Sequence, residues 1–136
     1  MPGTQRSAVL VDVSNAMVRL HKEQFGRGPQ SARSYFAGPD ALLCVLERAL
    51  LPAEQKLVAL GDHNRVRDSR TSFQAATADE FVSAVENIVG RKVIAFASGI
   101  DADNDVVFEN FYFEPDASSD GLGKLPQDGQ VLDSSP

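Results

Sequence analysis

The chain has 136 residues, 43% of them hydrophobic, and both numbers suit one domain with a single core. Its formal net charge of −6 is uneven, because the segment from Glu114 onward carries −4 and leaves only −2 for the rest. The near-neutral charge of residues 1–113 argues against a nucleic-acid binder. No apolar run has the roughly 20 residues of a membrane-spanning helix. The single cysteine, Cys44, excludes an internal disulfide.

The first seven residues are polar and lack the apolar region of a signal peptide. We therefore expect a flexible N-terminus over residues 1–7 and a cytoplasmic protein. Apolar residues then recur at helical spacing from Val9 to Leu20, and Gly26 is a natural stop. This pattern predicts an amphipathic first helix.

A β-hairpin is predicted next, because residues 31–37 and 41–47 are rich in strand-forming side chains and Gly38-Pro39-Asp40 between them is typical of a turn. The following helix is expected to begin at Pro52, which suits the first helical position, with Glu54 at the positive end of the helix dipole. This helix should stop near residue 61.

Two further helices are predicted before the chain returns to strands. The first covers residues 62–76. The second begins at Thr77, where Thr77 and Glu80 have the spacing of a capping box, and it ends at Gly90. With the helix that begins at Pro52, these predictions place three helices in succession.

A second hairpin is predicted from residues 92–98 and 106–113, with a turn at residues 101–104. From residue 115 to 136 the chain is mostly small, polar and acidic, which predicts a disordered acidic tail. Residues 8–114 then form a single α+β domain with the order α-β-β-α-α-α-β-β. We expect the two hairpins to form one antiparallel four-stranded sheet with the helices on one face.

The last strand carries apolar side chains on both of its faces. Alternation places one set, Val106, Phe108 and Tyr112, opposite a second set, Val107, Phe111 and Phe113. Neither set of side chains is polar enough to face solvent. The sequence therefore predicts a homodimer that covers the sheet face on which no helix packs. The alternative is that the helices wrap both faces of the sheet.

The most suggestive candidate site is the junction Gly26-Arg27-Gly28-Pro29. Flanking glycines permit positive φ angles, so successive N–H groups and the Arg27 guanidinium can hold an anion together. Arg67 and Arg70, three residues apart on a predicted helix, can join Arg27 in a basic pocket. The alternatives are an ion pair of Arg27 with Glu23 or Asp68, and a solvated helix face on which Asp62 and Asp68 neutralise the arginines.

Other chemical motifs are weak. The acidic run 101–105 begins like a calcium loop but has Val106 and Tyr112 where glycine and glutamate are needed, so a plain turn is expected. His21 and His63 lack metal-ligand spacing and are expected at the surface. Cys44 lies in an apolar strand, as a small buried hydrophobe does. We therefore predict no catalytic residue, no metal, no cofactor and no enzymatic activity.

Several segments together carry a family resemblance: helix one, Gly26-Arg27-Gly28-Pro29, Leu51-Pro52-Ala53-Glu54, Arg65-Val66-Arg67 with Arg70, and Gly90-Arg91-Lys92-Val93. They resemble the small bacterial MpsC family, described as a component of a sodium-translocating, membrane-potential-generating system. The resemblance covers residues 8–114 and departs from the family at Leu51, where members often have threonine.

The resemblance implies an association with a membrane transport complex. Because no apolar run is long enough to cross a membrane, we expect no direct membrane insertion and a membrane role only through a partner. Together with the surplus apolar face, it leads to the hypothesis of a non-enzymatic, dimeric accessory or regulatory domain that acts through a protein partner. The alternative hypothesis is a small-molecule sensor that binds an anionic metabolite or nucleotide at Arg27, Arg67 and Arg70.

Overall fold

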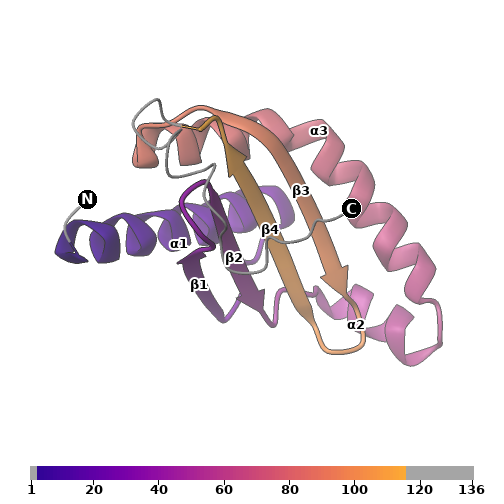
Figure 1. Cartoon of the computed structure of the whole chain (residues 1–136). Coiled ribbons are helices and arrows are strands. Elements are labelled where there is room, and N and C mark those ends of the chain that lie inside the picture. Colours follow the sequence, from indigo (N-terminus) through magenta and orange to yellow (C-terminus); the bar gives the residue numbers. More distant parts are fainter. Residues whose placement is uncertain (1–2, 116–136) are drawn as a thin grey trace, which may run out of the picture.

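The structure is a computed structural model that describes residues 3–115, and it consists of three helices and one four-stranded sheet (Figure 1). In chain order the elements are α1 (Gly3–Phe25), β1 (Ser31–Phe36), β2 (Ala41–Glu47), α2 (Pro52–Ala59), α3 (His63–Val89), β3 (Val93–Asp101) and β4 (Val106–Phe113). The acidic tail predicted over residues 115–136 lies, except for its first residue, outside the described part.

The two predicted hairpins join into one antiparallel sheet with the strand order β1-β2-β4-β3. The last strand, β4, therefore inserts between β2 and β3. Helix α1 packs against β1 and β2, and α3 packs against β3. Figure 1 shows both helices behind the sheet, on the same side. The predicted α+β class, with helices on one face of a four-stranded sheet, is confirmed.

Two helix boundaries differ from the prediction. Helix α1 begins at Gly3, five residues before the expected domain start. The helix start predicted at Thr77 is wrong, because α3 continues from His63 to Val89. Thr77 does not cap a new helix; its hydroxyl donates to the Phe73 carbonyl one turn earlier, at 2.8 Å. This stretch contains no glycine or proline that would interrupt a helix.

The core lies between the helices and the inner face of the sheet. At its centre the rings of Phe81, Phe96 and Phe111 form a stack, with centroids 6.1 Å and 4.8 Å apart. The apolar stripe of α1 closes the core over β1 and β2. The buried members of this core include Val13, Ala16, Met17, Leu20, Leu42, Cys44, Leu46, Val85, Val107 and Phe113.

The other face of the sheet is not covered by any helix of residues 3–115. We call it the open sheet face. Strand register and the alternation of burial place on it the odd-numbered residues of β1 and β2, the odd-numbered residues of β3 from Ala95 onward, and the even-numbered residues of β4. A register shift between Val93 and Ala95 turns Val93 into the core instead. Tyr35, Phe108 and Tyr112 are 47%, 37% and 46% exposed there. The predicted division of the β4 side chains is confirmed, and the alternative of helices on both faces is not seen in this part of the chain.

Candidate functional site

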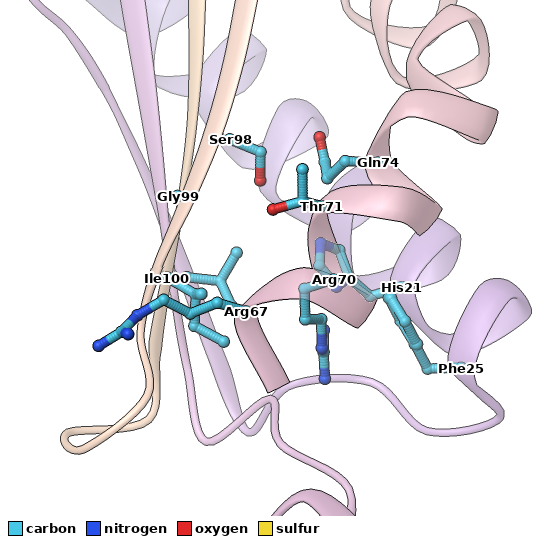
Figure 2. Close-up of a pocket in the computed structure, with 10 residues that line it drawn as sticks. His21, Phe25, Arg67, Arg70, Thr71, Gln74, Ser98, Gly99 and Ile100 are labelled. Atoms are coloured by element: carbon cyan, nitrogen blue, oxygen red, sulfur yellow. The ribbon is translucent and has the colours of Figure 1, made fainter. Parts of the chain in front are cut away.

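A cavity of about 180 Å³ lies between α1, α3 and the β3–β4 hairpin (Figure 2). Its wall combines apolar groups, hydroxyls, an amide, an imidazole and two guanidinium groups. In Figure 2 the Ser98 side chain on β3 points toward Thr71 on α3, and Arg67 extends from α3 toward the β3 ribbon. The lining residues are His21, Phe25, Arg67, Arg70, Thr71, Gln74, Ser98, Gly99, Ile100 and Val107.

A buried imidazole and carboxylate form one wall of the site. His21 on α1 is 2% exposed and Glu109 on β4 is fully buried, and His21 Nε2 lies 2.9 Å from Glu109 Oε2. When Glu109 is ionised it can only accept a hydrogen bond, and His21 Nε2 is then the donor. The Gln74 amide donates to both Glu109 oxygens, at 3.3 and 3.4 Å. The carboxylate therefore has two side-chain donors in place of water.

The expectation of surface histidines is wrong for His21. This residue is four positions after Met17, so it continues the apolar stripe of α1, and Glu109 alternates with the buried Val107 and Phe111 on β4. Both sequence positions indicated the core. Only the fold shows that the two groups meet, because they are separated by 88 residues.

A second buried pair joins α2 to α3. Arg70 Nε donates to Glu54 Oε2 at 2.8 Å, and Arg70 Nη2 donates to Glu54 Oε1 at 2.6 Å and to the Ala49 carbonyl at 3.0 Å. The guanidinium carbon also lies 4.0 Å from the centre of the Phe25 ring. Arg70 is only 6% exposed, so the prediction of a solvated helix face is wrong at this position.

The ion pair with Arg70 helps to lower the pKa of Glu54. Burial alone would raise its pKa, but the hydrogen bond from Arg70, the hydrogen bond from the Leu51 N–H and the Arg70 charge outweigh burial and hold the pKa below its ordinary value of 4.5. Leu51 has no side chain that can cap α2, so the bond from its N–H to Glu54 Oε1, at 2.7 Å, ties down this helix start.

We expect the Glu54 pair to make stability depend on pH. Because the pKa of Glu54 is lowered in the folded state, its contribution is present above the ordinary value of 4.5 and is lost as the pH falls through the lower folded value. The free energies of unfolding of wild type and Glu54→Gln, measured with urea, should therefore differ most near neutral pH and become similar in acid. A difference that grows on acidification would contradict this assignment.

The structure divides the predicted anion-binding set. Arg67 and Arg70 line the cavity, whereas Gly26, Arg27 and Gly28 lie at the α1–β1 junction and do not. Gly26 ends α1 with a φ of 80°, and Gly28 is close to Val18, whose Cγ1 would lie 3.3 Å from an added Cβ. The junction thus has structural reasons for both glycines. The anion-binding role of Arg27 stays a prediction.

The suggested ion-pair partners of Arg27 are placed differently. Among the described residues Arg27 has no carboxylate within ion-pair distance, and Glu23 instead lies 3.8 Å from Arg19 Nε. Arg67, which is exposed, donates to Asn64 Oδ1 at 3.0 Å. Of the two arginines that line the cavity, Arg67 is therefore the one that can turn toward a ligand at its mouth, because Arg70 is held by Glu54.

The acidic run at 101–105 forms the β3–β4 turn, as predicted. Asp101 accepts from the backbone and side-chain N–H groups of Asn104, which lower its pKa. Asp105 Oδ1 accepts from the N–H groups of Ala49 and Leu50, at 2.8 and 2.9 Å, and so ties the turn to the segment before α2. Nowhere in the described part do three or more potential metal-ligating side chains gather.

Cys44 is fully buried on the inner face of β2. Burial raises the pKa of its thiol to about 11, the nearby charge of Glu109 raises it as well, and the Ser34 hydroxyl partly opposes the shift. A thiol of this kind is a poor nucleophile. We expect a disulfide reagent such as DTNB to react with Cys44 only as fast as the native protein opens. Immediate stoichiometric labelling of the folded protein would contradict this placement.

These observations define a class: a small α+β domain with one helix-covered sheet face, one open face and a mixed polar cavity at its edge. The family model MpsC, described as "Na+-translocating membrane potential-generating system (MpsC)", matches residues 5–115. The chain therefore belongs to the MpsC family, and the resemblance inferred from its motifs is confirmed. No curated protein and no solved structure matches the chain. Across residues 3–115, no helix combines the length and apolarity needed to cross a bilayer.

Proposed function

We propose that the domain is a non-enzymatic accessory component that acts through protein association, first with a second copy of itself. Its setting is the cytoplasmic side of the Na⁺-translocating system after which its family is named. The observation that carries this proposal is the apolar character of the open sheet face.

The open sheet face has the composition of an interface core. Its large side chains are Tyr35, Leu43, Val45, Phe108 and Tyr112, and aromatic side chains are enriched in interfaces. Four strands spaced about 4.8 Å apart, each about seven residues long, give a flat footprint of roughly 450 Å² per protomer. Pairing two such faces covers about 900 Å² in total, which is below the range of about 1,200–2,000 Å² of stable specific interfaces and predicts a weak, reversible dimer.

The charged side chains of this face are Arg33, Glu47 and Asp101, and Glu47 stands at the end of the central strand β2. Arg33 lies on the edge strand β1, and Asp101 ends the opposite edge strand β3. In a two-fold pair whose axis runs along the strands, the β1 edge of one copy lies over the β3 edge of the other. That arrangement brings Arg33 of one copy toward Asp101 of the other at both rims and favours one orientation of the pair.

The proposal of a non-enzymatic role is supported by how the titratable groups near the cavity are used. His21 and Glu109 face each other, Arg70 is bound by Glu54, and the Cys44 thiol has a raised pKa. Each of these groups contributes to packing or to a buried pair. None of them is arranged as a nucleophile beside a general base.

Light scattering coupled to size exclusion tests the dimer. We expect wild type at tens of micromolar to show a mass near twice that of one chain and to dissociate on dilution. Phe108→Lys should be monomeric because it buries a charge at the centre of the pair. Leu60→Lys is the matched control, since Leu60 is 82% exposed and lies outside the sheet. A monomeric wild type, or a dimeric Phe108→Lys, would overturn the proposed interface.

The connection to sodium transport needs a separate test. In cells that lack the gene, we expect the sodium-dependent part of the membrane potential, read with a potential-sensitive dye, to be reduced and to be restored by wild type and by Leu60→Lys. Phe108→Lys should fail to restore it although it folds. If Phe108→Lys fully restored the sodium-dependent potential, the role in sodium transport would not depend on the open sheet face.

A further inference from the structure

We propose that the cavity between α1, α3 and the β3–β4 hairpin binds a small organic carboxylate with a compact apolar body. This ligand site is separate from the open sheet face and does not depend on the dimer. The proposal rests on the size of the cavity, on its two kinds of wall and on a buried Arg70 N–H group that lacks a partner.

The size of the cavity limits the ligand. A volume of about 180 Å³ is similar to that of the engineered 150 Å³ protein cavity that holds benzene. A molecule with one ring or one branched chain therefore fits, whereas a nucleotide does not. The apolar wall, made by Phe25, Ile100 and Val107, suits the body of such a ligand.

The charge of the cavity selects an anion. Its wall contains Arg67 and Arg70 and no carboxylate. Of the acidic groups nearby, Glu54 binds Arg70, and Glu109 is hydrogen-bonded to His21 and Gln74. Asp101 accepts from Asn104 and is also near enough to Arg67 for the Arg67 charge to help lower its pKa. A guanidinium group is the side chain best shaped to hold a carboxylate. Arg67, at the exposed end, can turn from Asn64 toward the ligand.

One lining residue leaves a buried donor unused. Arg70 is more than nine-tenths buried, and its Nη1 has no hydrogen-bond partner among the described residues. Buried polar atoms are rarely left without a partner, since this costs stability. In Figure 2 the Ser98 and Thr71 side chains point toward each other, while the Arg70 guanidinium points toward the opposite end of the drawn site. Both hydroxyls line the cavity and offer further hydrogen bonds to a ligand.

The test uses benzoate as the probe, benzamide as its neutral counterpart and acetate as a carboxylate without a ring. Binding is followed by amide chemical shifts of the full chain. We expect benzoate to bind in the millimolar range or tighter, to shift Thr71, Ser98 and Gly99, and to bind at least about tenfold more tightly than benzamide or acetate. Equal binding of benzoate and benzamide, or no binding of benzoate, would overturn the proposal.

Matched variants locate the site. Arg67→Ala should weaken benzoate at least about tenfold, whereas Arg65→Ala, an exposed arginine two residues earlier that pairs with Asp62, should leave it unchanged. Thr71→Phe should fill the cavity and abolish binding, whereas Ser72→Phe, on the next position of α3 and outside the cavity wall, should not. Benzoate binding that survives Thr71→Phe would place the ligand elsewhere.

Discussion

Arg70→Ala is expected to lower the free energy of unfolding by about 3–5 kcal/mol, the usual cost of removing one partner of a buried ion pair. The variant leaves the Glu54 carboxylate buried beside the freed Ala49 carbonyl, and it removes the guanidinium from the Phe25 ring. Because Arg70 links α3 to the start of α2, both helices lose a contact. Urea unfolding at neutral pH measures the effect.

Arg65→Ala is the control for this prediction. The Arg65–Asp62 pair is also on α3 and has a distance of 3.0 Å, but the two side chains are 73% and 38% exposed, so its loss should cost less than about 1 kcal/mol. The double variant Arg70→Met with Glu54→Leu should recover much of the loss, since an apolar pair needs no charge compensation. Equal costs for Arg65→Ala and Arg70→Ala would show that burial of the pair has been misjudged.

Phe111→Ala is expected to cost about 3–5 kcal/mol, as large-to-small substitutions of buried phenylalanine do. Phe111 is 1% exposed, lies on the second central strand β4 and stacks on Phe96 at a centroid distance of 4.8 Å. Phe96 also stacks on Phe81, so removing the Phe111 ring leaves a cavity beside both remaining rings at the centre of the core. Chemical unfolding monitored by circular dichroism gives the value.

Phe108→Ala is the matched control, because Phe108 is three residues away on the same strand and points to the open sheet face. In dilute, monomeric protein, this change should cost roughly 1 kcal/mol, in proportion to the smaller apolar area that Phe108 buries within one chain. A cost for Phe108→Ala that matches that of Phe111→Ala would contradict the assignment of the two faces.

Local sequence signals were sufficient for most of the fold. The two hairpins were predictable because alternation and turn residues act over a few positions, and Gly90, with a φ of 78°, ends α3 as its sequence position indicated. The capping-box spacing at Thr77 led to a wrong helix start. Inside a helix, the same hydroxyl can instead donate to a carbonyl of the preceding turn, as Thr77 does to Phe73. Local pattern alone does not decide between these two uses.

The site was less predictable than the fold. The sequence identified Arg67 and Arg70 as candidates, but it placed Arg27 with them and missed His21 and Glu109. The sequence signal for His21 and Glu109 was that each polar residue stands at a core position of an amphipathic pattern. Their pairing could not be predicted, because it depends on a contact between α1 and β4, which are far apart in the chain. The pairing of Arg70 with Glu54 likewise depends on how α2 folds back onto α3.

The association of open sheet faces can be measured directly through the tyrosines. The chain has two, Tyr35 and Tyr112, and both lie on the open sheet face. Protein labelled with 3-fluorotyrosine is observed by ¹⁹F NMR with a soluble paramagnetic probe, at high and at low concentration. We predict that both resonances are protected at high concentration and become accessible on dilution. Resonances that are equally accessible at every concentration would contradict the proposal that this face binds a second copy.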